Sequence, residues 1–282
     1  MRRFMFAILL VGFLGGCSQE PQTVDELSRA GEEAFDNHEY ARARKYLTKA
    51  VAQKPSDRHL LYLLGISYQR DFLYDSAFHY LKRLDLLFPG DREVNLRLYK
   101  IAKTVREWKS AIKAIQVLVE TGDPGEQYHA ELADLNLKVK NYKVAYYFYR
   151  KLLEADPNNP SYYLLIANLA AQLDSLDISL AVVDSALERF GDRDEFLVNK
   201  GLYLAAMKRY EESEATFRYL LAKDSSFLPA RLNLAHALAT QDDRAKKREA
   251  LQLYLQLRPV ADEVLRLDSL IGALREELNI KN

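Results

Sequence analysis

The chain has 282 residues, with 40 basic and 40 acidic side chains and a single cysteine, Cys17. The balanced charge excludes a general electrostatic attraction to nucleic acid or to anionic lipid. One cysteine cannot form an intrachain disulfide, so the folded part must be stable without cross-links, which a hydrophobic content of 49% allows.

The N-terminus has the pattern of an export signal. Arg2 and Arg3 precede an apolar run over residues 4–14, which is shorter than the roughly 20 residues of a membrane-spanning helix. Residues 14–16, Leu-Gly-Gly, supply the small residues of a cleavage site directly before Cys17. Leu-Gly-Gly-Cys also resembles the lipobox of bacterial lipoproteins. The alternative is an ordinary cleaved signal with an incidental cysteine.

The resemblance to lipoproteins implies that residues 1–16 are a removed signal peptide and that 17–23 are the lipidated Cys17 and a short tether. In that family the cysteine carries more than one acyl chain, whereas a single chain would bind a membrane only marginally. Ser18, in place of an aspartate, favours the outer membrane, so we expect a lipid-anchored protein of the bacterial cell envelope that faces the periplasm. The six residues from Ser18 to Thr23 reach at most about 20 Å, which keeps the following domain close to the bilayer.

From Val24 onward the chain repeats with a period of 34 residues. Four positions of this period are marked in several repeats. A proline recurs at Pro55, Pro89 and Pro157, and an aromatic residue recurs at Tyr40, Tyr74, Trp108, Tyr142 and Tyr210. Small residues recur at two positions: Ala43, Ala77, Ala111, Ala145, Ser179 and Ser213; and Gly31, Gly65, Ala133, Ala167, Gly201 and Ala235. A fixed period of this length is typical of a solenoid. The repeats are expected at 24–57, 58–91, 92–125, 126–159, 160–193, 194–227 and 228–261.

The second repeat shows most completely which family the pattern resembles. It contains Leu61, Leu64, Gly65, Tyr68, Tyr74, Ala77, Leu81, Leu84 and Pro89. At this spacing they resemble the marks of the tetratricopeptide repeat, a helix–turn–helix unit, and the resemblance covers over four-fifths of the chain. It implies an all-α fold, a right-handed superhelical solenoid of about seven repeats. Stacking would form the continuous core, because one repeat cannot bury its own apolar face.

The seventh repeat is irregular, because Arg244 and Lys247 occupy its aromatic and alanine positions. We expect a longer turn at 241–243 and a shifted second helix, so that the in-phase Pro259 is coincidental. The shifted core positions are Ala250, Tyr254 and Leu257. Residues 262–282 are expected to form a capping helix with one apolar stripe. Its members are Val264, Leu265, Leu267, Leu270, Ile271, Leu274 and Leu278.

The sequence offers little for catalysis. The five histidines lack metal-ligand spacing, and the sequence has no Gly-rich phosphate loop, His-Glu-x-x-His or Gly-x-Ser-x-Gly motif. Acidic pairs such as 32–33 and 211–212 are typical of solvated helix faces. We therefore expect a protein that is not an enzyme, with no catalytic residue, metal, cofactor or small-molecule substrate.

The family resemblance implies that positions 2, 5, 6, 9, 12 and 13 of each first helix line a groove. In the second and third repeats these positions include Tyr62, Ile66, Gln69, Arg70, Leu96, Arg97, Lys100 and Lys103. An apolar strip beside basic residues suits a partner segment with acidic and apolar side chains. The alternative is that Ile66 and Leu96 pack between repeats and that the charges are only solvated.

Two other sets of residues are candidates for binding. Asn199 and Asn233 share position 6, with Asn168 at position 9, and the resemblance implies that such amides hydrogen-bond a peptide backbone. Isolated surface asparagines are the alternative. On the second helices, a convex patch for a partner or a dimer is expected, unless neighbouring repeats partly bury it. Its members are Tyr46, Tyr80, Tyr147 and Phe148.

These features predict a non-enzymatic, lipid-anchored scaffold or adaptor that binds a protein or peptide partner in the bacterial envelope. Lipid-anchored repeat proteins of this kind include pilotin-like assembly factors for secretins, barrel-assembly accessory lipoproteins and regulators of wall-building enzymes. A chaperone-like binder of extended peptides is the other alternative. Binding to unfolded peptides would favour the chaperone, and one stoichiometric folded partner would favour the scaffold.

The resemblance to a lipobox predicts that Cys17 is acylated. Cys17→Ser should abolish incorporation of labelled fatty acid in a bacterial host, because it removes the thiol that the acyl group requires. Processing before residue 17 should stop as well. A wild-type chain that takes up no label would contradict lipid anchoring.

Overall fold

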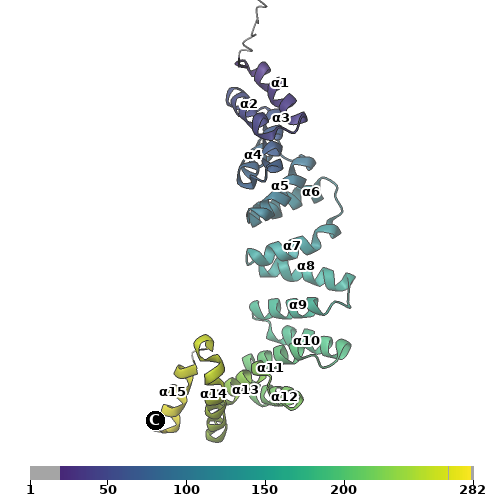
Figure 1. Ribbon diagram of the computed structural model, residues 1–282. Helices are drawn as coiled ribbons and strands as arrows, with labels where there is room; N and C mark the ends of the chain where they lie inside the picture. Colours follow the sequence, from purple (N-terminus) through teal and green to yellow (C-terminus); the bar gives the residue numbers. More distant parts are fainter. Residues whose placement is uncertain (1–19, 266, 281–282) are drawn as a thin grey trace, which may run out of the picture. The chain divides into compact units, whose positions relative to one another are not determined.

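A computed structural model describes residues 20–265 and 267–280, with the backbone alone described for 260–265. These residues form fifteen α-helices and one 3-10 helix, and the described ranges contain no β-strand. The all-α prediction is confirmed. Short turns join the helices into pairs, and each pair packs against the next pair along the chain within each of two compact units (Figure 1).

The two compact units meet in the chain between Thr121 and Gly122. The first unit contains α1 (Val24–Asp36), α2 (Tyr40–Gln53), α3 (Arg58–Arg70), α4 (Tyr74–Leu87), α5 (Arg92–Thr104) and α6 (Trp108–Glu120). The second unit contains the 3-10 helix η1 (Gly125–Tyr128), α7 (His129–Lys138), α8 (Tyr142–Ala155), α9 (Pro160–Gln172), α10 (Leu176–Phe190), α11 (Asp194–Ala206), α12 (Tyr210–Lys223), α13 (Leu228–Ala239), α14 (Arg244–Leu265) and α15 (Leu267–Leu278).

Side-chain caps start several of the first helices. An N-cap oxygen accepts a hydrogen bond from the first turn of α1, α3, α5 and α9. The capping residues are Thr23, Asp57, Asp91 and Asn159. Before the fourth repeat the equivalent residue is Gly125, which has no side chain. There η1 replaces the first turn, so Glu126, the expected start of the repeat, lies in a 3-10 helix and α7 begins at His129.

The turn inside each of the first six repeats has one residue in the left-handed region, with φ between 57° and 62°. These residues are His38, Phe72, Arg106, Lys140, Asp174 and Lys208. The next residue donates its N–H to a carbonyl near the helix end, as Glu39 does to Ala34 at 2.8 Å. This closes a Schellman turn. The turn of the seventh repeat, at residues 240–243, has no residue in the left-handed region. Helix α14 begins at Arg244, where the 34-residue period places it, so the expected shift of the helix start is wrong.

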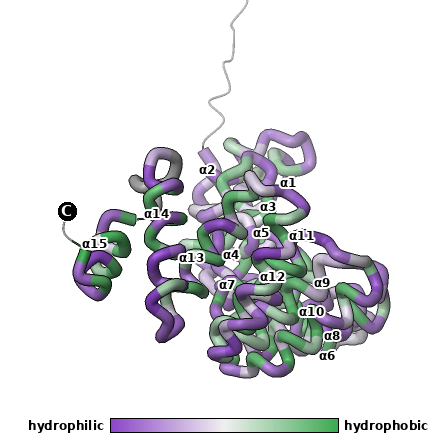
Figure 2. Tube along the Cα trace, turned by 90° about the horizontal axis from the view of Figure 1, so that it is seen from below, coloured by the Kyte–Doolittle hydropathy of each residue, from purple (hydrophilic) through white to green (hydrophobic). Residues whose placement is uncertain are grey.

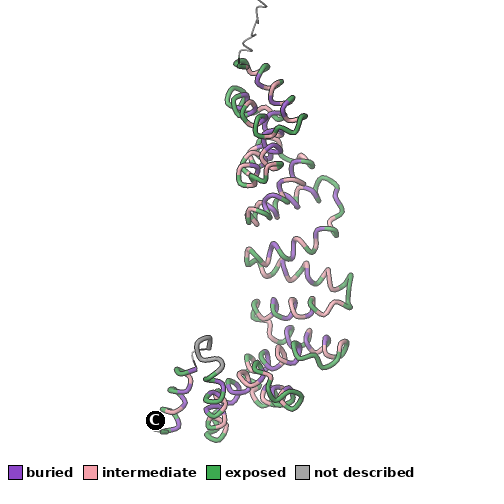
Figure 3. Tube along the Cα trace, viewed as in Figure 1, coloured by how far each residue is buried: buried purple, intermediate pink, exposed green. Residues whose placement is uncertain are grey.

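The core depends on a close approach between the two helices of a repeat. A Cβ atom on Gly31 would lie 2.7 Å from Leu47, and a Cβ atom on Gly201 would lie 2.5 Å from the Phe217 ring. The small residue at position 8 therefore makes room for the side chain at position 24. Buried and exposed residues alternate along the helices in Figure 3, and apolar and polar residues alternate along them in Figure 2.

The C-terminal helices differ from the expected boundary at 261–262. Helix α14 continues through Pro259 to Leu265, so this proline does not end the helix although it cannot donate a backbone hydrogen bond. The shifted core positions of the seventh repeat are at most 1% exposed, and α15 buries four of the expected stripe residues. These four are Leu267, Ile271, Leu274 and Leu278. The side chains of Val264 and Leu265 lie outside the described residues.

Lys113 shows that an outward-facing position is not always neutral for stability. The repeat phase places it on the outer side, and its side chain is 63% exposed. Its ammonium nevertheless lies 3.5 Å from the Asp85 carboxylate, whose side chain is 6% exposed. Asn95 donates a hydrogen bond to the other oxygen of Asp85 at 2.9 Å. Because a buried carboxylate needs such partners, Lys113 is a poor control for a surface substitution.

Ala77 tests the packing between paired helices. It is fully buried next to Ile66 and Leu81, so Ala77→Leu should overpack the core and lower the free energy of unfolding by about 1–3 kcal/mol. Lys109→Ala, at an exposed position of α6, should change it by less than about 0.5 kcal/mol. Denaturant melts that show equal effects would contradict the repeat register.

Candidate functional site

Tyr62, Glu93 and Arg97 form a polar cluster between α3 and α5. The Arg97 Nε atom donates to the Glu93 carboxylate at 2.8 Å and to the Tyr62 hydroxyl at 3.1 Å. The guanidinium also lies 5.7 Å from the centre of the Tyr62 ring. Two of the residues expected to contact a partner are therefore close together, but Glu93 neutralises Arg97 within the chain.

The apolar strip expected beside these residues is not exposed. Ile66 is 3% exposed and packs against Leu98 and Ile101 of the next repeat, so it cannot contact a partner. The expectation for Ile66 is corrected in favour of packing between repeats, because the neighbouring first helix covers this position. Leu96 is half-buried, and Gln69 has a buried Oε1 atom with no hydrogen-bond partner in the described part of the chain.

The remaining cations of the expected groove stay on the surface. Arg70 and Lys100 are exposed, and the ammonium of Lys103, which is also exposed, lies 5.8 Å from the centre of the Tyr99 ring. Without an exposed apolar strip, this part of the first unit offers positive charge but little apolar area.

The three asparagines are at the surface but partly engaged. The Tyr203 hydroxyl donates to Asn168 Oδ1 at 2.7 Å, and Asn199 Nδ2 donates to the Glu195 carbonyl of its own helix at 2.8 Å. Asn233 is half-buried on α13. Asn168 keeps its amide donors and Asn199 keeps its acceptor, so each retains only part of the hydrogen-bonding capacity that a peptide backbone would use.

Three first helices of the second unit, α9, α11 and α13, share a larger feature, the loss of ionic side chains at three repeat positions. Helix α9 contacts α11, and α11 contacts α13. Their positions 6, 9 and 13 are all exposed or half-exposed and hold no Asp, Glu, Lys or Arg. We call these nine residues the uncharged face: Leu165, Asn168, Gln172, Asn199, Leu202, Ala206, Asn233, His236 and Thr240.

The other repeats differ sharply at the same positions. In the first three repeats, positions 6, 9 and 13 comprise nine residues, and six of them are charged: Arg29, Glu32, Asp36, Arg70, Arg97 and Lys100. In the fourth repeat all three are charged: Glu131, Asp134 and Lys138. The change between the fourth and fifth repeats is visible in the sequence once the register is known, but motif searches do not find it.

His236 does not add charge to the uncharged face at neutral pH. The residue as a whole is exposed, but its ring packs edge-on against the buried Tyr254, with the centroids 5.4 Å apart. Desolvation lowers the pKa of His236, and its Nδ1 atom lies 2.7 Å from the Tyr254 hydroxyl. The imidazole is therefore neutral near pH 7.

The second-helix aromatics do not form a common exposed patch. Tyr46, Tyr80 and Phe148 are half-buried against the cores of their own compact units, and Tyr80 stacks on Tyr68 with centroids 5.4 Å apart. Tyr147 is 55% exposed. Three of the four residues of the expected convex patch are therefore partly buried, as the alternative interpretation of that patch proposed.

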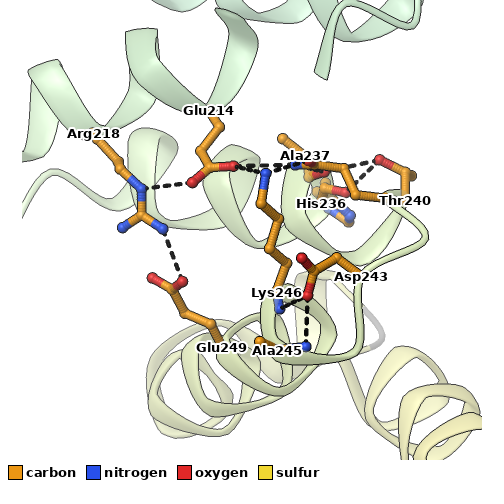
Figure 4. Close-up of polar contacts among 10 residues, drawn as sticks. Glu214, Arg218, His236, Ala237, Thr240, Asp243, Ala245, Lys246 and Glu249 are labelled. Atoms are coloured by element: carbon orange, nitrogen blue, oxygen red, sulfur yellow. Dashed lines mark hydrogen bonds and ion pairs between the residues drawn. The ribbon is translucent and has the colours of Figure 1, made fainter. Parts of the chain in front are cut away.

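A polar network that the sequence did not reveal joins α12 to α14 (Figure 4). Glu214 accepts from Arg218 at 2.9 Å and from Gln241 at 3.2 Å, and Lys246 lies 2.9 Å from it. Arg218 also donates to Glu249 at 2.8 Å. Gln241, which is 6% exposed, belongs to the turn of the seventh repeat, so the network attaches this turn to the sixth repeat.

Two observations limit the chemistry of the described residues. Among residues 20–259 and 267–280, whose side chains the structure describes, no three His, Cys, Asp or Glu side chains gather in a geometry that would hold a metal ion. No helix in the described part of the chain is long and apolar enough to cross a membrane. The expected signal peptide at 1–16 and the lipidation site Cys17 lie outside the described residues.

Comparisons with known proteins agree with the helical repeats. The profile of a family described as tetratricopeptide repeat matches residues 28–91 and 164–226. A search of curated proteins gives no match. A solved chain from "Naa15/Naa10 bound to HypK-THB" is similar over 92% of this chain, with a TM-score of 0.59 and 16% identity, and this chain spans 39% of that one.

Two other solved structures match this chain over most of their own length. A tetratricopeptide repeat protein from Parabacteroides merdae has a TM-score of 0.44 and 13% identity, with 89% of this chain and 98% of that one covered. YrrB, "a TPR protein with an unusual peptide-binding site", has a TM-score of 0.44 and 14% identity, with 65% and 95% covered.

The Glu214 network predicts a pH-dependent stability difference. Burial alone would raise the pKa of Glu214, but hydrogen bonds from Lys246, Arg218 and Gln241 outweigh it and lower the pKa below 4.5. A lowered folded-state pKa stabilises the fold above the unfolded-state value and loses that effect as pH falls through the folded value. Glu214→Gln should therefore cost about 1 kcal/mol at neutral pH and progressively less below about pH 4.5.

Glu211→Gln, at an exposed position of the same helix, is the matched control. Urea melts of both variants between neutral and acidic pH would measure the difference. A Glu214→Gln variant that is as stable as the wild type at neutral pH would contradict the role given to the network.

Proposed function

The chain belongs to the tetratricopeptide-repeat family, and we propose that it is a non-enzymatic scaffold or adaptor that holds a protein partner on its uncharged face. The observation that supports this proposal is the loss of all charge at positions 6, 9 and 13 in three consecutive repeats. A surface that only needs solubility would carry ionic side chains there, as the first four repeats do.

The composition of the uncharged face suits an apolar partner segment. Leu202 lies at the centre of this face on α11 and is 41% exposed. Ala206 lies one turn further along α11, and Leu165 lies on the neighbouring helix α9. Exposed apolar side chains on adjacent helices gain free energy when a partner covers them. Asn168 and Asn199 supply hydrogen-bonding groups that suit a polypeptide backbone, but they add no charge to select an ionic segment.

The first unit contributes differently to this proposal. Ile66 is buried and Arg97 is paired with Glu93, so Arg70 and Lys100 are left to contact acidic groups at the edge of a partner. Exposed charges of this kind mainly influence the rate of association and its salt dependence, rather than the affinity.

The proposed location is the bacterial cell envelope, with the chain attached to the outer membrane through Cys17. The support is the Leu-Gly-Gly-Cys sequence after an apolar run, together with the short distance along the chain from Cys17 to the first repeat. An adaptor held in this way would keep its partner near the membrane surface.

A chaperone-like role is the second candidate, and the asparagines on the uncharged face favour it. An uncharged surface with backbone-binding amides would accept many unfolded apolar segments, whereas a scaffold would bind one folded protein. Stoichiometric binding to one partner at saturation would favour the scaffold.

Leu202 allows a matched test of the proposed face. Leu202→Glu should weaken binding to arrayed uncharged apolar peptides by at least about tenfold, because it places a charge where a partner removes water. Ile178→Glu is the control, because Ile178 is 46% exposed on the second helix α10 of the same compact unit. Affinity would be measured by fluorescence anisotropy with the best peptide. Equal losses in the two variants would contradict the assignment.

A further inference from the structure

The two helices of the first repeat carry opposite charge. Helix α2 contains four basic side chains and no acidic one: Arg42, Arg44, Lys45 and Lys49. Helix α1 contains five acidic side chains and one basic: Asp25, Glu26, Glu32, Glu33, Asp36 and Arg29. The chain as a whole has no net charge. Any electrostatic preference of the first repeat is therefore local, and it depends on which helix faces a charged surface.

The segment that leads to Cys17 is attached to α2. The Glu20 carboxylate lies 2.9 Å from the Lys45 ammonium and 3.6 Å from that of Lys49. Gln53 of the same helix donates to the Gln22 carbonyl at 3.0 Å. Three residue steps separate Glu20 from Cys17, and they span at most about 11 Å. The proposed acyl attachment point therefore lies within this distance of Glu20, whose side chain pairs with the middle of α2.

The outward stripe of α2 consists of Arg42, Lys45, Tyr46 and Lys49, one helical turn apart. The three cationic side chains are 58%, 52% and 49% exposed. The Arg42 and Lys45 charges lie 5.9 and 5.7 Å from the centre of the half-buried Tyr46 ring. Cations around an amphipathic aromatic ring suit a membrane interface.

We propose that the outward stripe of α2 lies against the anionic headgroups of the bilayer that holds the acylated Cys17. This inference rests on the lipid anchoring proposed above and adds the orientation of the first repeat. The acyl chains hold α2 within the range of the surface charge, and the acidic α1 is turned away from it.

The ion pairs of the stripe do not prevent this contact. Arg42 pairs with Glu39 at 2.8 Å, and Lys45 and Lys49 share Glu20, but every partner is at least 46% exposed. Exposed pairs of this kind contribute little, so lipid phosphates can replace the carboxylates. Because the attraction is screened within a Debye length, added salt should weaken it.

The native lysines report the orientation directly. Acylated protein on phosphatidylcholine vesicles is compared with the same protein on equal parts phosphatidylcholine and phosphatidylglycerol. An amine-reactive, membrane-impermeant reagent and mass spectrometry give the reactivity of each lysine. On the anionic vesicles Lys45 and Lys49 should react about fivefold more slowly, and salt should restore their reactivity. Lys100, exposed on α5, should not change. Equal reactivity of Lys45 and Lys49 on both vesicles would overturn the proposal.

Two variants with the same change in net charge separate the stripe from general charge. Arg42→Glu with Lys45→Glu should abolish the protection of Lys49, whereas Arg70→Glu with Arg106→Glu should leave it intact. If both variants retain or both lose the protection, the stripe is not the contact. Protection in native envelopes but on no protein-free vesicle would assign the stripe to an acidic protein and overturn the lipid contact.

A second preparation separates this proposal from the anchoring itself. The thiol of Cys17, in a chain that begins there, is coupled to a maleimide lipid, so that the protein stays on the vesicle even if no host acylates it. Protection of Lys45 and Lys49 in this preparation supports the orientation whatever the result of fatty-acid labelling. Its absence overturns the orientation and leaves the labelling result to decide the anchoring.

Discussion

The fold depends on one close contact inside each repeat. Residue 8 of the repeat, on the first helix, packs against residue 24, on the second helix. Phe217 fills this contact in the sixth repeat, and a Cβ atom on Gly201 would lie only 2.5 Å from its ring. In the second repeat the smaller Leu81 leaves 3.2 Å for a Cβ atom on Gly65. Because a small residue at one position faces a large residue at the other, each helix pair can approach closely, and the repeats stack regularly within each compact unit.

Regular stacking determines which residues reach the surface. It buries Ile66 between first helices, so a residue that the family pattern places in a groove is part of the core. It also aligns positions 6, 9 and 13 of α9, α11 and α13, which turns three separate sequence positions into the uncharged face. Function in such a fold follows from side chains that the packing does not use, and Leu202 is an exposed large apolar side chain of this face.

The 34-residue period was sufficient to predict the helices, because aromatic and small residues recur in phase in most repeats, with a proline in three of them. Six first helices begin where the period places them, at Val24, Arg58, Arg92, Pro160, Asp194 and Leu228. The left-handed turn residues were not predictable from composition, since Phe72 and Lys140 replace the glycine or asparagine that such a turn favours. In the Glu214 network, the contacts that join α12 to Gln241 and α14 are between residues 27 or more positions apart, which no local pattern reports.

Whether the uncharged face holds a partner can be measured by placing a photoreactive amino acid at Leu202 in the full chain and illuminating native envelopes. If the face holds a partner, illumination should give one discrete crosslinked protein, with a much lower yield when the same amino acid replaces the similarly exposed Ile178 on α10. Equal yields at the two positions, or no product at Leu202, would contradict binding at this face.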